Sequence, residues 1–181
     1  MIVLPYTDDM IKQARKEAKE LGPLNNSILK GAGNVAGFLG ELAVTEYLGA
    51  KRISNDEGVS KYSHDIIWKG KRCEVKTKRR LKTPKKDYDV SIASTSTHQR
   101  SLAEIYLFIS LEFESSKYDP QIGGKVYKGL KKIWLVGQKS AKDYFNEAVF
   151  YPKGQVTGSN NFKTVRDMYN LPIGQLDEVY R

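Results

Sequence analysis

HDIIWKGKRCEVKTK, residues 64–78, decides the fold expected for this chain. Two short segments with β-branched and aromatic residues flank Lys69-Gly70, which is the pattern of a tight β-hairpin. A two-residue turn there sets Asp65 opposite Glu74, on the same side of the sheet, with Cβ atoms roughly 4.5–5.5 Å apart. Strand alternation places Lys76 on the face of Glu74. A three-residue turn would shift this register by one.

Two carboxylates this close repel each other and destabilise a sheet, whereas a divalent cation between them reverses the effect. The simpler alternative is that Asp65, Glu74 and Lys76 are solvent-exposed charges on an antiparallel strand, as in most acid-x-lysine triplets. Glu41 lies upstream in the apolar segment AGFLGELAVTEYL, at 36–48, and an acid there needs a reason. The coincidence of these acids, in this order, favours a metal site.

The remaining patterns predict helices and strands that follow one another along the chain. Helices are expected over 8–21 and 35–48, ended by Gly22-Pro23 and Gly49. Further short helices are expected between 94 and 103, over 142–148 after an N-cap at Ser140, and near 162–169. Strands are expected at 51–54, 64–68, 72–78, 88–93, 104–113 and 132–137, the last two joined by a polar loop with Gly123-Gly124. This order predicts a single α/β or α+β domain.

Composition favours a polyanionic partner and an intracellular location. The 181 residues carry a formal net charge of +9, so DNA, RNA or an acidic membrane surface would attract the chain. One cysteine, Cys73, excludes an internal disulfide and fits a reducing, cytoplasmic compartment, in a viral or prokaryotic setting among others. We expect no membrane span and no secretory signal. GAGNVAG, at 31–37, lacks the rest of a phosphate loop, so no nucleotide cofactor is expected.

Glu41, Asp65 and the triplet Glu74-Val75-Lys76 together resemble the PD-(D/E)xK nuclease superfamily. His64 stands where the family usually has a proline, and the strand at 104–113 fits its next core strand. The resemblance implies a restriction-endonuclease-like core, a central mixed β-sheet flanked by helices, over 33–138. An N-terminal helical extension at 1–30 and a helical or irregular C-terminal extension at 139–181 would complete one nuclease domain.

The resemblance also implies a role for each motif residue. Asp65 and Glu74 would coordinate Mg²⁺, for which Mn²⁺ would substitute, and the Val75 carbonyl would be a backbone ligand. Glu41 would approach from its helix, toward water on the metal or toward a second ion. Lys76 would orient the attacking water and stabilise charge on the phosphate, although a plain phosphate contact is its simpler role.

The implied activity is a metal-dependent DNA endonuclease of restriction or homing type. A Holliday-junction resolvase or another structure-specific nuclease is the alternative within this class, and cutting at two places implies a homodimer. A non-catalytic nucleic-acid-binding protein is the alternative of another class, but it has no use for converging acids. The basic segment 69–86 would grip the DNA backbone or form a solvated face, and His98 and Gln99 would enter the site or cap a helix. The residues expected on DNA are Lys78, Arg79, Arg80 and Lys82.

Overall fold

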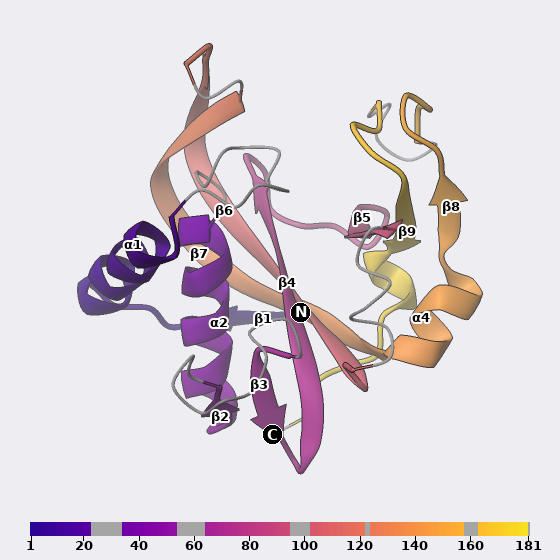
Figure 1. The fold of residues 1–181 in the computed structure, drawn as a ribbon, viewed down its shortest axis with the longest axis horizontal. Coiled ribbons are helices and arrows are strands. Elements are labelled where there is room, and N and C mark those ends of the chain that lie inside the picture. The colour runs from indigo at the N-terminus through magenta and orange to yellow at the C-terminus, as the bar shows by residue number, and fades with distance from the viewer. Residues whose placement is uncertain (23–33, 54–63, 95–101, 122–123, 158–162, 181) are drawn as a thin grey trace.

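The computed structural model describes residues 1–22, 34–53, 64–94, 102–121, 124–157 and 163–180. These residues form a mixed α/β structure with two sheets (Figure 1). Helices α1 and α2 cover one face of the larger sheet, and the smaller sheet lies with α4 on the other side of it (Figure 1). None of the helices in these ranges is long and apolar enough to cross a membrane.

The larger sheet has six strands in the order β1-β7-β6-β4-β3-β2. β4 and β6 pair in parallel, whereas the other neighbours are antiparallel, so the sheet is mixed as expected. Its strands are β1 (Ile2–Leu4), β2 (Lys51–Arg52), β3 (Ile66–Trp68), β4 (Lys71–Arg80), β6 (Ile105–Asp119) and β7 (Gly124–Ser140).

The β3–β4 hairpin has the two-residue turn that the sequence predicts. Lys69 and Gly70 both have positive φ, 50° and 74°, as a type I′ turn requires. The turn pairs Trp68 with Lys71 and Ile66 with Cys73, which is the predicted register. This hairpin therefore sets the positions of the motif residues on either side of it.

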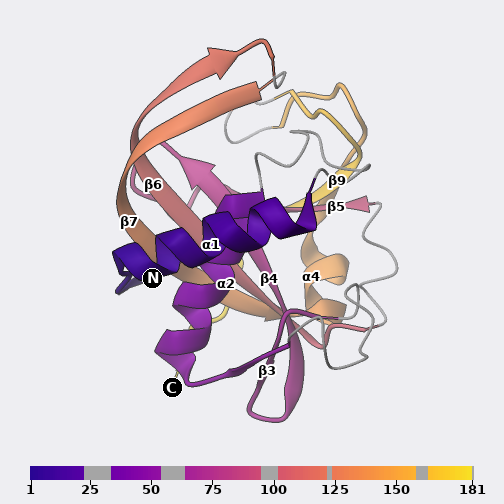
Figure 2. The same cartoon turned by 60° about the vertical axis from the view of Figure 1, so that its left-hand side comes forward.

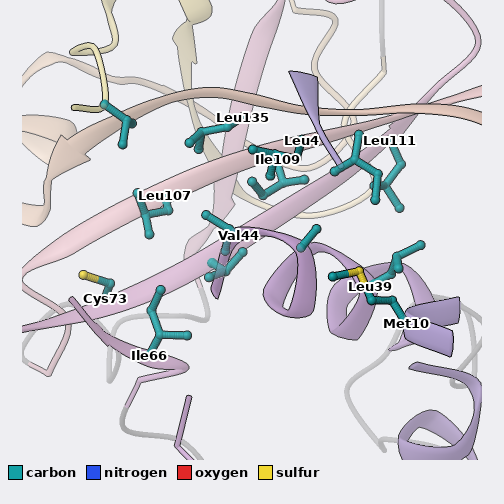
Figure 3. Close-up of a cluster of buried hydrophobic side chains, with 14 of the residues drawn as sticks. Leu4, Met10, Leu39, Val44, Ile66, Cys73, Leu107, Ile109, Leu111 and Leu135 are labelled. Atoms are coloured by element: carbon teal, nitrogen blue, oxygen red, sulfur yellow. The ribbon is translucent and has the colours of Figure 1, made fainter. Parts of the chain in front are cut away.

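Two helices and a hydrophobic core hold the hairpin in place. α1 (Asp8–Leu21) begins at Thr7, whose hydroxyl accepts the Met10 N–H at 3.2 Å, and it lies across α2 (Asn34–Leu48) (Figure 2). Gly40 of α2 lies so close to β4 that any larger side chain would overlap Thr77. Side chains of α2, β3, β4, β6 and β7 fill the core beneath, among them Leu39, Val44, Ile66, Cys73, Leu107, Ile109 and Leu135 (Figure 3).

The smaller sheet has the order β5-β9-β8 and packs on the opposite face of β6. Its strands are β5 (Asp89–Ala93), β8 (Val149–Tyr151) and β9 (Met168–Pro172), and α4 (Ala141–Glu147) begins at the predicted N-cap Ser140. Phe108 of β6 stacks on Tyr144 of α4 with ring centroids 5.4 Å apart. Along β6, even-numbered apolar residues thus face this second core and odd-numbered ones face α2.

Three predictions about the elements are wrong. The helix expected near 162–169 is absent from the described part of that range, because β9 begins at Met168 and pairs with both β5 and β8. The polar loop between the strands at 104–113 and 132–137 is instead the outer part of two long paired strands. The N-terminal extension is not only helical, since β1 joins the larger sheet beside β7. The helix expected between 94 and 103 lies mostly outside the described residues.

Candidate active site

Asp65 lies directly before β3, with its carboxylate against β4. Its backbone N–H donates to the Cys73 carbonyl at 3.0 Å, and its Oδ2 accepts the Val75 N–H at 2.7 Å. Burial raises the pKa of Asp65 well above its ordinary range, and the carboxylates of Glu74 and Glu41 raise it further. The two carboxylates therefore lie close enough for their charges to repel each other. The described strand register begins at Ile66, one residue after Asp65, so the direct pairing of Asp65 with Glu74 stays a prediction.

Glu74 and Lys76 lie on one face of β4, as strand alternation predicts. Lys76 Nζ donates to Glu74 Oε1 at 2.6 Å, and the Glu74 side chain is only 6% exposed. A charge-assisted hydrogen bond of this length offsets part of the cost of burying the carboxylate. Lys76 thus holds one predicted metal ligand in place.

Glu41 reaches the same region from the middle of α2. Burial raises the pKa of Glu41, and the negative charge of Glu74 adds to this effect, although Arg52 opposes it. Arg52 Nη2 lies 2.8 Å from Glu41 Oε2. The structure thus brings together Glu41, Asp65 and Glu74, closely enough for each carboxylate charge to act on another.

Arg52 is the site residue that the sequence did not indicate. It belongs to β2 and binds Glu17 of α1 with both nitrogens of its fork, at 2.8 and 2.7 Å, in addition to Glu41. Its guanidinium also lies over the Phe38 ring at 5.5 Å. The basic pair at 51–52, directly after the end of a helix, was its only signal, and nothing in the local pattern connected it with Glu41.

The Val75 carbonyl lies on the edge of β4 that faces Asp65. In an extended strand the N–H and C=O of one residue point to the same side, and the Val75 N–H points to the Asp65 carboxylate. β3 pairs with β4 only as far as Cys73, so β3 leaves the Val75 carbonyl without a strand partner on that side. This position suits the backbone ligand that the motif implies.

The donor atoms fit a hard divalent cation in charge and in chemical type. Asp65, Glu74 and the Val75 carbonyl offer oxygen atoms, which are the ligands Mg²⁺ prefers, and the repulsion between the acids would fall once a cation joined them. Within the described ranges, no three His, Cys, Asp or Glu side chains form a metal-binding group. Two side-chain ligands and one backbone ligand describe the candidate site. Glu41, whose carboxylate binds Arg52, stays a predicted ligand of water on the metal or of a second ion.

The four cations expected on DNA differ in their surroundings. Lys78 Nζ donates to the Asp89 carbonyl at 3.1 Å and to Ser91 Oγ at 3.2 Å, and burial lowers the pKa of Lys78 to about 8. Arg80 donates to the same Asp89 carbonyl at 2.7 Å. Both cations thus join β4 to the smaller sheet.

Arg79 and Lys82 differ from each other in exposure. The Arg79 guanidinium lies 4.6 Å above the Tyr127 ring, and Lys82 is exposed. DNA contact by all four cations stays a prediction. His98 and Gln99, which the sequence offered as further site residues, lie outside the described residues.

Comparisons with known proteins give no match: no protein-family model fits the chain, and a search of curated proteins finds none similar to it. The function of the protein is therefore inferred from the geometry of the carboxylates and from the resemblance of their spacing to a nuclease motif.

Proposed function

We propose that the protein is a Mg²⁺-dependent DNA endonuclease acting through Glu41, Asp65, Glu74 and Lys76. The observation that carries this proposal is the crowding of the acids: burial and neighbouring carboxylates raise the pKa of both Asp65 and Glu41. Acids that only made a strand soluble would point into water and away from one another. Groups held in such an unfavourable arrangement are typical of functional sites.

The fold supports the same proposal. A helix bearing an acid packs on a mixed sheet, a hairpin presents the second acid and the acid-x-lysine strand, and a parallel strand follows. This is the arrangement that the resemblance to PD-(D/E)xK nucleases implies, so we propose a restriction-endonuclease-like core. Cutting both strands of a duplex requires two copies of the site, which leads us to propose a homodimer.

Each residue of the site has a distinct part in phosphodiester hydrolysis. Asp65, Glu74 and the Val75 carbonyl would hold the Mg²⁺, which would supply Lewis-acid activation of water and offset charge on the phosphate. Lys76 Nζ, now on Glu74 Oε1, would turn one of its three protons toward the attacking water or a phosphate oxygen. Glu41 Oε would accept a hydrogen bond from that water. Arg52 would keep Glu41 in position.

Cleavage assays with matched variants test this function. Supercoiled plasmid, linear duplex and a four-way junction would be incubated with Mg²⁺, Mn²⁺ or EDTA. We expect metal-dependent cutting by the wild type, none by Glu74→Ala or Asp65→Ala, and full activity in Glu20→Ala, which removes an exposed acid on α1. The substrate that is cut fastest separates a restriction- or homing-type enzyme from a junction resolvase. Absence of cutting of all three DNAs would refute the proposal.

A further inference from the structure

β6 and β7 continue as a two-stranded ribbon beyond the larger sheet. β4 pairs with β6 only as far as Glu112, and β1 pairs with β7 only from Ile133 onward. Past these residues, within the part of the chain that the structure describes, β6 and β7 pair only with each other, from Phe113 with Leu130 to Asp119 with Gly124. This ribbon, residues 113–119 and 124–131, is called the β-arm below, and Figure 1 shows it projecting from the body of the protein.

The base of the β-arm is fixed to the body. The register shifts between Glu112 and Phe113, and Phe113 packs on Tyr127 with ring centroids 5.3 Å apart. Arg79 of β4 lies over the same Tyr127 ring, and the Tyr6 hydroxyl donates to the Leu130 carbonyl at 3.0 Å. These contacts orient the β-arm with respect to β4, so its direction is set by the fold.

The outer part of the β-arm buries little of its own surface. Tyr118 is 61% exposed and Val126 is 37% exposed. An isolated two-stranded ribbon is marginally stable in water. Among the described residues of the β-arm, only Phe113 and Leu130 at its base pack against the hydrophobic core. Seventeen-residue and fifteen-residue strands that run past their sheet therefore point to a purpose other than packing.

The β-arm is basic. Lys117, Lys125 and Lys128 are all exposed, and Lys131 nearer the base is exposed as well. Two acids, Glu114 and Asp119, leave an excess of positive charge along the ribbon. Lysines spaced along an exposed element suit a partner with regularly spaced negative charges, which is the property of a nucleic-acid backbone.

β4 connects the candidate active site with the β-arm. From Glu74 in the candidate site, β4 continues to Arg80, and Arg80 pairs with Glu112 at the base of the β-arm. Six residues of extended strand cover roughly 20 Å, and the seven β6 residues of the β-arm extend a similar distance again. A duplex bound at the carboxylates and running along β4 would therefore reach the β-arm within about one to one and a half helical turns of B-DNA.

We propose that the β-arm inserts into the major groove of duplex DNA beside the site of cleavage. That groove is about 12 Å wide and admits a two-stranded ribbon. Lys117, Lys125 and Lys128 bind the phosphates along the groove walls, while Tyr118 at the tip contacts base edges. The choice of DNA as the partner rests on the proposed function, but binding of the β-arm in the groove requires no metal and no catalysis.

Binding of a labelled duplex in EDTA tests the proposal separately from cleavage. The test variant replaces Lys117, Lys125 and Lys128 by alanine, and the control variant replaces three exposed lysines elsewhere, Lys142, Lys153 and Lys163. All six side chains are exposed, so both variants should fold, and both lose the same charge. We expect the test variant to lose at least about tenfold in duplex affinity and to lower the salt slope by about 2 to 3, and the control to change little.

Chemical footprinting identifies the groove. Wild-type protein should protect guanine N7, which lies in the major groove, from dimethyl sulfate, and the test variant should lose this protection. The affinity and the footprint should be present in EDTA even if no nuclease activity is found for the wild type, because groove binding requires no metal. Equal losses in the test and control variants, an absent N7 footprint or failure of the wild type to bind duplex would each overturn the proposal.

Discussion

Lys76 Nζ lies 2.6 Å from Glu74 Oε1, so the two charged residues of the acid-x-lysine triplet bind each other. A cation entering between Asp65 and Glu74 would compete with the Lys76 ammonium for the same carboxylate oxygen. The ammonium would then be released toward the substrate, where a hydrogen-bond donor is needed. This exchange predicts opposite effects of Lys76 on metal binding and on catalysis.

Lys76→Met should lower the single-turnover cleavage rate by about 10²–10³, the usual cost of losing one preorganised donor to developing charge. Its affinity for Mn²⁺, measured by calorimetry without DNA, should equal or exceed that of the wild type, because Glu74 no longer has a competing partner. Glu74→Ala provides the comparison, since this variant should lose both DNA cleavage and Mn²⁺ binding. Weaker Mn²⁺ binding by Lys76→Met would contradict the exchange.

Asp65→Asn should make the protein more stable and inactive. The raised pKa of Asp65 means that the ionised carboxylate costs more free energy in the folded state than in the unfolded chain. An amide keeps an oxygen for the Val75 N–H and removes the repulsion from Glu74 and Glu41. Thermal unfolding in EDTA checks this, since each kcal/mol gained raises Tm by about 2–4 °C in a chain of this size. If Asp65→Asn had a lower Tm than the wild type in EDTA, the Asp65 carboxylate would be stabilising the fold.

Local chemistry explains why the sequence predicted the centre of the fold correctly. The Lys69-Gly70 turn, the helix stop at Gly49 and the Ser140 cap each depend on residues adjacent in the chain. The apolar composition of α2 is likewise a property of neighbouring residues in the chain. These features place Asp65, Glu74 and Lys76 without reference to any distant segment.

Features that depend on distant partners could not be predicted in the same way. The outer halves of β6 and β7 are strands because their backbones pair with each other, and their exposed polar side chains show no apolar period. β9 is a strand because β5 and β8 flank it. Arg52 meets Glu17 and Glu41 only after α1, α2 and β2 have packed together.

Arg52→Met should destabilise the protein more than Glu17→Gln. The first change leaves two carboxylates, on Glu17 and Glu41, without the guanidinium that binds both of them, and we expect a loss of about 2 kcal/mol or more. The second change keeps an oxygen that can accept from Arg52 and leaves the Glu41 contact intact, so its cost should stay below about 1 kcal/mol. Urea unfolding in EDTA measures both values.

A double variant separates the two partners of Arg52. Adding Glu41→Gln to Arg52→Met should restore part of the lost stability, because the buried charge that lacked a partner is removed. Adding Glu17→Gln instead should restore little, since Glu17 lies nearer the surface on α1. Equal recovery by both second changes would mean that Arg52 offsets the charges of Glu17 and Glu41 alike, and recovery by Glu17→Gln alone would mean that Arg52 serves mainly to hold α1.

Lys78 should make the free energy of unfolding depend on pH above pH 8. Burial, together with the positive charge of the nearby Arg80, lowers the pKa of Lys78 to about 8, against an ordinary value of 10.5 in the unfolded chain. Between these two values the unfolded state binds more protons than the folded state, so the contribution of Lys78 to stability rises with pH. Below about pH 8, Lys78 is charged in both the folded and the unfolded states, so the folded state bears the full cost of burying its charge.

Lys78→Met removes this titration and shows its sign. The wild type should gain about 2–3 kcal/mol relative to Lys78→Met as the pH rises from 8 to 10.5, which follows from the difference between the two pKa values. Urea unfolding at several pH values in this range measures the difference directly. Lys142→Met, which changes an exposed lysine, should run parallel to the wild type. If the gap between wild type and Lys78→Met were constant with pH, Lys78 would remain charged in the folded protein and its bonds to Asp89 and Ser91 would be those of an ammonium group throughout.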